Sequence, residues 1–191
     1  MNIILASNSP RRRDLLQQLG LPFTVRTMSG IDEHFPAGLS HEDTAIYIAR
    51  AKAEAYRPTL ADDELLITAD TIVCIDGCVL GKPVDAADAS RMLHLLSGRT
   101  HEVVTGVTLL TRARRECFAV TTRVTFAPLT DGIIDHYITH YKPFDKAGAY
   151  GIQEWIGCVG VARVEGSFYN VIGLPVQRLY AALRHFLPDL V

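Results

Sequence analysis

Residues 65–75, LLITADTIVCI, constrain the fold of this chain more than any other stretch. The run is long, largely apolar and rich in the β-branched residues that favour strands. Asp76 and Gly77 follow it, and Asp-Gly between two apolar runs is a strong signal for a type I′ hairpin turn. The sequence therefore predicts a long buried strand that turns into the short strand of CVLGKP, with Cys74 and Cys78 offset rather than directly opposite.

The rest of the chain alternates between strand-like and helix-like patterns. Strands are predicted at residues 2–6, 102–110, 116–126 and 157–164. Helices are predicted at residues 10–19, 40–56, 85–96, 130–141 and 175–187. Because long antiparallel stretches interrupt the strand–helix alternation, we predict an α/β fold with a mixed sheet flanked by helices.

Composition limits the class of protein. The 191 residues are 48% hydrophobic and 21% charged, which predicts a single folded domain over 1–191. The net charge of −2 provides no overall basic field, so we expect no nucleic acid partner and only a locally built anion site. The sequence shows no apolar run of membrane-spanning length and no signal peptide, so we expect no membrane partner and a cytoplasmic location. The four cysteines include no CxxC pair, and we expect them to be reduced thiols.

The helix predicted at 10–19 begins with cations where acidic residues are favoured. Ser9 is a preferred N-cap and Pro10 is tolerated at the first helical position. Arg11, Arg12 and Arg13 then follow, although the helix dipole is positive there. A strand, a turn and a helix N-terminus form an anion site, so these arginines suit a phosphate chain. The alternative is a solvated basic turn.

Asp70 lies inside the predicted strand 65–75, where an ionised carboxylate is costly unless it is paired or bound to a metal. A carboxylate that binds Mg²⁺ or activates water fits this position, because Mg²⁺ commonly takes one or two carboxylates plus substrate phosphates. Asp32 and Glu33, in a polar loop, are candidate acidic neighbours. A hydrogen-bonded structural aspartate, and a plain surface loop at 32–33, are the alternatives.

Lysines at helix and strand ends are further candidates for a phosphate site. Lys52 lies on the helix predicted at 40–56, Lys82 follows a strand in LGKP, and Lys146 begins a glycine-rich stretch. Each of them, taken alone, is more often a solvated surface charge, but together they suit a triphosphate with a metal. His101 is a candidate base or a hydrogen-bonded structural histidine.

The glycine-rich stretch DKAGAYGIQ, residues 145–153, carries groups suited to a nucleobase. Tyr150 offers a stacking face, and the Gln153 amide has the donor and acceptor that reading a pyrimidine edge requires. An ordinary irregular loop is the alternative. The chain has no nucleophile elbow GxSxG, no HExxH zinc motif and no Cys–His pairing that suggests covalent catalysis. This favours metal-assisted attack of water on a phosphoanhydride.

Several blocks of the sequence, taken in order, resemble the signature blocks of the Maf family of nucleotide pyrophosphatases. The blocks are LASNSPRRRDLL, ADTIV, LGKP, LSGRTHEVVTGV, DKAGAYGIQ and GSFYNVIGLP, and they span residues 5–175. Within the family, Pro10 and the YGIQ sequence at 150–153 resemble the dTTP/UTP pyrophosphatase branch rather than the branch that acts on 7-methyl-GTP.

The resemblance implies a two-lobed, inosine-triphosphatase-like α/β fold with an elongated, twisted sheet and a central cleft, and a homodimer. It implies hydrolysis of dTTP and UTP, and of modified pyrimidine nucleotides, to the monophosphate and pyrophosphate with Mg²⁺ or Mn²⁺. The alternatives are a nucleotide-binding regulator of cell division without turnover, or a methylated-GTP pyrophosphatase.

The resemblance also implies roles for single residues. Asp70 is expected to activate water and, with Glu33, to bind the metal. Arg12, Thr71 and Gln153 are expected to set specificity. The phosphates are expected to be held by Ser7, Arg11, Lys52 and Lys82.

Overall fold

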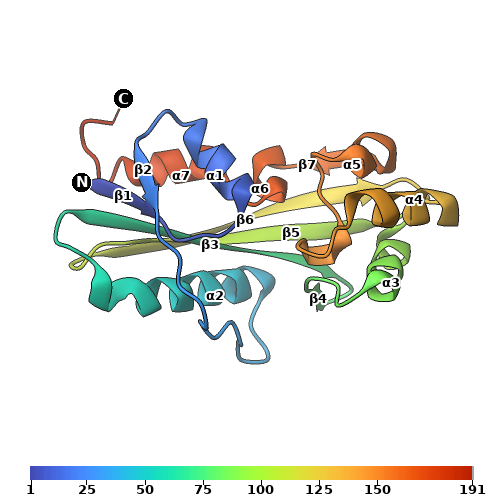
Figure 1. Ribbon diagram of the computed structural model, residues 1–191, viewed down its shortest axis with the longest axis horizontal. Coiled ribbons are helices and arrows are strands. Elements are labelled where there is room, and N and C mark those ends of the chain that lie inside the picture. The colour runs from blue at the N-terminus through green and yellow to red at the C-terminus, as the bar shows by residue number, and fades with distance from the viewer. Residues whose placement is uncertain (191) are drawn as a thin grey trace. The chain divides into compact units, whose positions relative to one another are not determined.

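The structure, a computed structural model, describes residues 1–190. Its strands are β1 (Asn2–Leu5), β2 (Phe23–Val25), β3 (Glu64–Ile75), β4 (Cys78–Leu80), β5 (Thr100–Leu110), β6 (Arg115–Phe126) and β7 (Val161–Glu165). They form one sheet in the order β2-β1-β3-β5-β6-β7, with β4 paired to β3 (Figure 1). Strand β1 is parallel to β2 and β3, whereas the pairs β3–β4 and β6–β7 are antiparallel. The predicted α/β fold with a mixed sheet flanked by helices is confirmed.

The helices connect and cover these strands. They are α1 (Pro10–Gln17), α2 (His41–Tyr56), α3 (Ala86–Leu96), α4 (Asp131–Tyr141), α5 (Trp155–Gly160), α6 (Phe168–Ile172) and α7 (Val176–Leu183), with 3₁₀ turns η1 (Arg57–Thr59) and η2 (Ala147–Ala149). Every helix within residues 1–190 is too short or too polar to cross a membrane.

The hairpin at the end of β3 has the predicted geometry. Asp76 and Gly77 adopt positive φ angles of 52° and 74°, as a type I′ turn requires. In the resulting register Cys74 faces Val79, while Cys78 faces the residue after Cys74. The two cysteines are therefore offset, as predicted, and the structure has both as free thiols.

The C-terminal quarter differs from the sequence prediction. The strand predicted at 157–164 is wrong in its first half, because residues up to Gly160 belong to α5 and only β7 is extended. A Cβ on Gly157 would lie 1.8 Å from the Ile152 carbonyl oxygen, so a glycine here lets the chain coil closely on itself. Helix α7 is shorter than the predicted 175–187, and the short helix α6 was not predicted.

The chain divides into two compact units. The first contains residues 1–70, 105–120 and the chain from Gly173 onward, and the second contains residues 71–104 and 121–172. Strands β3, β5 and β6 contribute residues to both units. The single domain over 1–191 and the central cleft stay predictions.

In the first unit, α2 packs unusually closely on the sheet. A Cβ on Gly106 of β5 would lie 2.2 Å from the Ala45 carbonyl oxygen of α2, so the two backbones touch at this point. The buried Thr68 hydroxyl of β3 donates a 2.7 Å hydrogen bond to the Ala49 carbonyl. Figure 1 shows α2 on one face of these strands and α1 and α7 on the other. Helix α2 is thus held to β5 by a backbone contact and to β3 by a side-chain hydrogen bond.

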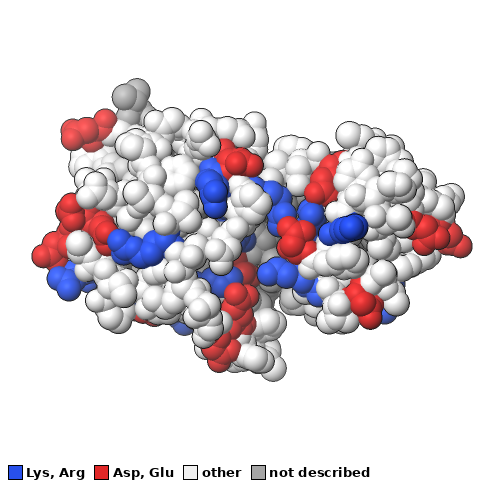
Figure 2. Space-filling view, viewed as in Figure 1, with Lys and Arg blue, Asp and Glu red and all other residues white. Residues whose placement is uncertain are grey.

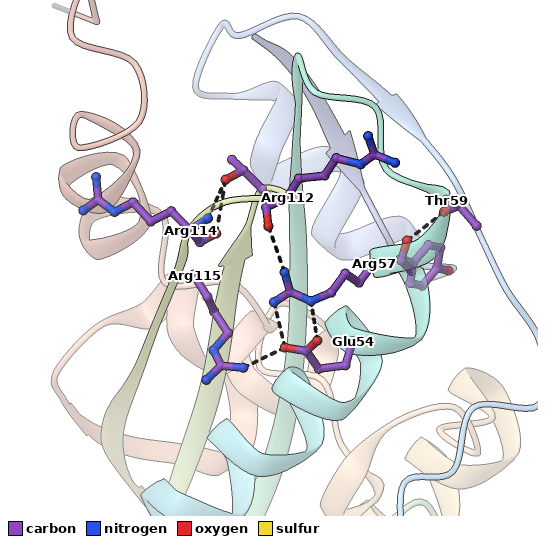
Figure 3. Close-up of polar contacts among 8 residues, drawn as sticks. Glu54, Arg57, Thr59, Arg112, Arg114 and Arg115 are labelled. Atoms are coloured by element: carbon purple, nitrogen blue, oxygen red, sulfur yellow. Dashed lines mark hydrogen bonds and ion pairs between the residues drawn. The ribbon is translucent and has the colours of Figure 1, made fainter.

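The C-terminal end of α2 is fixed by a shared carboxylate (Figure 3). Glu54 accepts hydrogen bonds from Arg57 at 2.6 and 3.1 Å and from Arg115 at 2.6 Å. Arg57 also donates to the Arg112 carbonyl at 3.2 Å, in the loop between β5 and β6. These bonds and charges lower the pKa of Glu54 to about 2, with Arg57 the largest contributor. Arg115 and the Arg112 carbonyl therefore help to hold the end of α2, whereas the Arg112 and Arg114 side chains bond to Asp62 and to the His185 carbonyl.

The face of the molecule drawn in Figure 2 carries charges of both signs, and its basic and acidic side chains are interspersed. This agrees with the net charge of −2. Any phosphate site must therefore come from a local arrangement of charges, as the sequence predicts.

The core of the second unit contains a buried histidine. His101 lies 5.5 Å from the Phe126 ring and 5.4 Å from the Tyr150 ring, measured between centroids. Its Nε2 is 2.7 Å from the Tyr150 hydroxyl, while its buried Nδ1 has no hydrogen-bond partner within residues 1–190. Burial lowers the pKa of His101 to about 4. This environment fits the structural alternative rather than a catalytic base.

The depressed pKa of His101 predicts acid destabilisation in a defined pH range. Because the folded-state pKa of about 4 lies below the ordinary value of 6.5, protonation favours the unfolded chain. The free energy of unfolding is expected to fall as pH drops from about 6.5 towards 4. Urea unfolding at pH 7.5 and pH 5 measures this difference. His101→Gln should reduce it, whereas the exposed control His140→Gln should leave it unchanged; equal differences in wild type and His101→Gln would contradict the assignment.

Candidate active site

The turn between β1 and α1 is built from serine hydroxyls and backbone amides. The Ser9 side chain caps α1 by accepting from the Arg12 amide at 3.4 Å, and Pro10 opens the helix as predicted. The buried Ser7 hydroxyl accepts from the Ser9 amide at 3.2 Å. The first turn of α1 holds arginines and no acidic residue. Its exposed positive dipole and guanidinium groups favour an anion at this end of the helix.

Parallel pairing brings this turn beside the end of the first-unit part of β3. Leu5 is in register with Ile67, and the pairing continues through a 2.9 Å hydrogen bond from the Ala6 amide to the Ile67 carbonyl. Ser7 is the residue after Ala6, and Asp70 lies three positions after Ile67. The carboxyl ends of parallel strands share one edge of a sheet, which is where ligands of open α/β sheets bind.

Lys52 joins the two predicted acidic residues. Its Nζ lies 2.7 Å from Oδ1 of Asp70 and 3.1 Å from Oε1 of Glu33. The Asp70 and Lys52 side chains are 13% and 15% exposed, whereas Glu33 is 55% exposed. Asp70 is therefore paired rather than isolated, which explains how a carboxylate can occupy this strand.

Arg12 belongs to the same group of charges. Its Nε donates a 2.8 Å hydrogen bond to the Gly173 carbonyl, which orients the guanidinium. Burial lowers the pKa of Arg12 and Arg11 adds to this effect, whereas the nearby carboxylates of Asp70 and Glu33 act in the opposite direction. The structure thus places Arg12 within electrostatic reach of both predicted acidic residues.

The carboxylate oxygens around Lys52 are suitable ligands for a divalent cation that is also bound by phosphate. An ammonium group already lies between Asp70 and Glu33, and both offer the hard oxygen atoms that Mg²⁺ and Mn²⁺ prefer. No cluster of three or more His, Cys, Asp or Glu side chains within residues 1–190 is arranged to hold a metal. The remaining ligands would have to be water and phosphate oxygens, which is usual for Mg²⁺.

The other predicted site residues belong to the second unit. Thr71 follows Asp70 directly in β3 and is half-buried, whereas Lys82 and Gln153 are exposed. The Gly148 amide donates a 3.0 Å hydrogen bond to the Gly81 carbonyl, so the loops that carry Lys82 and Gln153 are bonded together. That these three residues act on the same ligand as the first-unit residues stays a prediction.

Two features of the glycine-rich stretch 145–153 differ from the sequence-based interpretation. Tyr150 is 5% exposed and bonded to His101, so its ring packs in the core and is not a stacking face for a base. Lys146 is also buried and pairs with Asp145 at 2.7 Å and Glu154 at 3.1 Å. It is therefore an anchor of the loop rather than an exposed phosphate ligand.

Sequence reasoning missed the partners of these residues. Tyr137 of α4 donates a hydrogen bond to the Glu154 carboxylate and accepts one from the Gly151 amide at 3.0 Å. The Gly173 carbonyl that orients Arg12 was also missed. Gly173 has a φ of 131°, which only glycine adopts readily. The sequence shows the glycine but not its φ angle, so this contact could not be predicted.

Comparison with known proteins shows which family this chain resembles. The family model described as "Maf-like protein" matches residues 2–186. Among curated relatives, proteins named dTTP/UTP pyrophosphatase from Parabacteroides distasonis and Phocaeicola vulgatus are 56% and 57% identical, over 96% and 95% of this chain and 95% and 94% of theirs. A third protein of that name, from Porphyromonas gingivalis, is 55% identical over 96% of this chain and 94% of its own.

Solved structures are similar in fold. The Ham1 protein of Staphylococcus aureus has a TM-score of 0.55 at 17% identity and covers 97% of this chain and 100% of its own. A HAM1 protein from Coxiella burnetii has a TM-score of 0.53 at 16% identity, covering 97% and 99%. With the model match over nearly the whole chain and relatives above 50% identity, the chain belongs to the Maf-like protein family.

Proposed function

We propose that this protein is a nucleoside triphosphate pyrophosphatase that hydrolyses dTTP and UTP to the monophosphate and pyrophosphate. The observation that carries the proposal is the grouping of Asp70, Lys52, Glu33 and Arg12 beside a helix N-terminus in the first unit. The names of the three relatives above supply the substrate class. Modified pyrimidine triphosphates are included in the proposal because they present the same phosphate chain.

In this proposal Asp70 is the general base. Its carboxylate accepts a proton from water, whose oxygen forms a bond to the α-phosphorus while the bond to the oxygen bridging the α- and β-phosphates breaks. Pyrophosphate leaves with the electron pair of that bond. Lys52, which already donates to Asp70 at 2.7 Å, holds the carboxylate in place and contributes positive charge beside the phosphates.

The phosphate chain is assigned to the basic groups and to the turn before α1. Ser7, Arg11 and Arg12 lie in or beside this turn, where backbone amides and the helix dipole also favour an anion. Lys52 and Lys82 complete the set in the proposal. Catalysis of phosphoryl transfer rests mainly on positioning and charge stabilisation, which such a set provides.

The base is assigned to Thr71 and Gln153, together with Arg12 as a specificity position. An exposed carboxamide offers one donor and one acceptor, which match the edge of uracil or thymine. The preference for a pyrimidine with a carbonyl at position 4 is taken from the names of the relatives.

Asp70 and Glu33 are the proposed ligands of a divalent cation, Mg²⁺ or Mn²⁺. When bound, such a cation neutralises phosphate charge and polarises the phosphoanhydride. Lys52 lies between the two carboxylates and keeps them close together in the protein itself.

Incubation with each nucleoside triphosphate and Mg²⁺ or Mn²⁺, with separate detection of pyrophosphate and orthophosphate, tests the proposal. We expect pyrophosphate as the product, the highest kcat/KM for dTTP and UTP, and loss of turnover on chelation of the metal. Release of orthophosphate, or a preference for GTP derivatives, would overturn it. Nucleotide binding without turnover would instead identify a regulator.

Removal of the Gln153 amide should change selectivity more than turnover. In Gln153→Ala we expect the preference for UTP over the other ribonucleoside triphosphates to fall by roughly tenfold. Alanine cannot form the hydrogen bonds by which the amide would distinguish uracil from the other bases. The measurement is kcat/KM for UTP, CTP, GTP and ATP. The exposed residue Gln177 of α7 supplies the control variant Gln177→Ala, and an unchanged profile in Gln153→Ala would refute a role in reading the base.

We also propose that the protein acts in the cytoplasm as a homodimer. The relatives are named for the nucleotides dTTP and UTP, and the resemblance to the Maf family implies the dimer. Sedimentation equilibrium of the purified chain measures the oligomeric state, and a monomer at assay concentration would refute the dimer.

A further inference from the structure

The side chain of Gln153 can select a base only if its amide is held in one orientation. Rotation of a carboxamide by 180° exchanges its donor and its acceptor. Uracil presents a carbonyl oxygen at position 4 and an N–H at position 3, whereas cytosine presents an amino group and an unprotonated nitrogen. A freely rotating amide therefore pairs with either pyrimidine, and discrimination needs a group that fixes the amide.

Glu154 and Lys146 are the charged residues that share one space with that amide. A Cβ on Gly151 would lie 3.0 Å from Nε2 of Gln153, 3.0 Å from Cδ of Glu154 and 3.0 Å from Cε of Lys146. The amide, the carboxylate and the lysine chain therefore converge over one bare Cα. Only glycine leaves this space open.

The carboxylate of Glu154 is itself held from two sides. The fully buried Tyr137 donates a hydrogen bond to one oxygen, and the buried Lys146 lies 3.1 Å from the other. Tyr137 also accepts the amide hydrogen of Gly151 at 3.0 Å. A carboxylate with both oxygens engaged presents its negative charge in a fixed direction.

We propose that Glu154 is a positioning residue for base selection. Its charge orients the Gln153 dipole so that the NH₂ group, rather than the carbonyl oxygen, faces the carboxylate. The donor and acceptor are then presented to the base in one order, which for a protein that hydrolyses UTP is the order that matches uracil and thymine. Tyr137 and Lys146 act through Glu154. This inference rests on the proposed hydrolysis of UTP.

Glu154→Gln is the direct test, because it removes the charge and keeps the shape. The readout is the ratio of kcat/KM for UTP to kcat/KM for CTP, which does not depend on the fraction of active enzyme. We expect the ratio to fall by roughly tenfold, towards that of Gln153→Ala. Glu165→Gln, which removes an exposed carboxylate paired with Arg163, is the matched control and should keep the wild-type ratio.

A double variant separates positioning from an independent effect. If Glu154 acts only through the amide, Glu154→Gln combined with Gln153→Ala should have the same ratio as Gln153→Ala alone. A further fall in the double variant would overturn the inference. So would a wild-type ratio in Glu154→Gln.

Tyr137→Phe provides a second route should the Glu154 variant fail to fold. It keeps the ring, removes the bond to the carboxylate and should also lower the ratio, whereas Tyr141→Phe on the same helix should not. An unchanged ratio in Tyr137→Phe overturns the inference while hydrolysis of UTP by the wild type upholds the function. Absence of UTP hydrolysis in the wild type overturns both.

Discussion

Asp70→Asn is expected to lower kcat for UTP by at least about 100-fold, because general-base catalysis typically contributes 10²–10⁴. The amide keeps the size of the carboxylate and can still accept the hydrogen bond that Lys52 donates at 2.7 Å. It cannot accept a proton from water. The loss should therefore appear in kcat rather than in folding.

Steady-state kcat with Mg²⁺ and the thermal unfolding midpoint of the same sample measure the two quantities separately. Asp76→Asn is the matched control, since it changes an exposed aspartate of the β3–β4 turn that pairs with Arg99. That control should retain wild-type kcat. Near-normal turnover in Asp70→Asn would assign the base to another group, with Glu33 the first to examine.

Gly106→Ala is expected to destabilise the protein by more than the roughly 1–3 kcal/mol typical of overpacking. The new Cβ would lie 2.2 Å from a carbonyl oxygen and 2.5 Å from the next backbone nitrogen of α2. Backbone atoms cannot rotate away as a flexible side chain can, so the helix itself would have to move. Urea unfolding measures the change.

Gly132→Ala provides the contrast for Gly106. Gly132 lies in α4, where an added Cβ meets only the Thr130 hydroxyl at 3.9 Å. Gly132 lies in the first turn, so this substitution should be neutral or stabilising by less than the roughly 0.5–1 kcal/mol typical of the middle of a helix. Equal stability of the two variants would show that α2 can shift on β5 without loss.

Much of the fold could be predicted from residues with strong local conformational preferences. Ser9 and Pro10 start α1, and Asp76 with Gly77 closes the hairpin, because these residue types have strong conformational preferences of their own. That Asp70 needs a partner or a metal also follows from its place in an apolar strand, but the sequence does not identify Lys52 as that partner.

Features that depend on distant contacts could not be read in the same way. The Tyr150 ring is buried because His101, 49 positions earlier, lies beside it. Arg12 is oriented by the Gly173 carbonyl, 161 positions away. Local propensity does not contain this information.

The anchoring of the loop 145–153 has a thermodynamic consequence for ligand binding. Tyr150 and Lys146 are buried, and Tyr137 bonds to the Gly151 amide, so the loop is already ordered in the protein alone. A ligand that contacts it does not have to bear the conformational entropy of ordering it, which for a flexible loop weakens affinity. Such preorganisation predicts tight binding with little change in protection of these amides from hydrogen exchange.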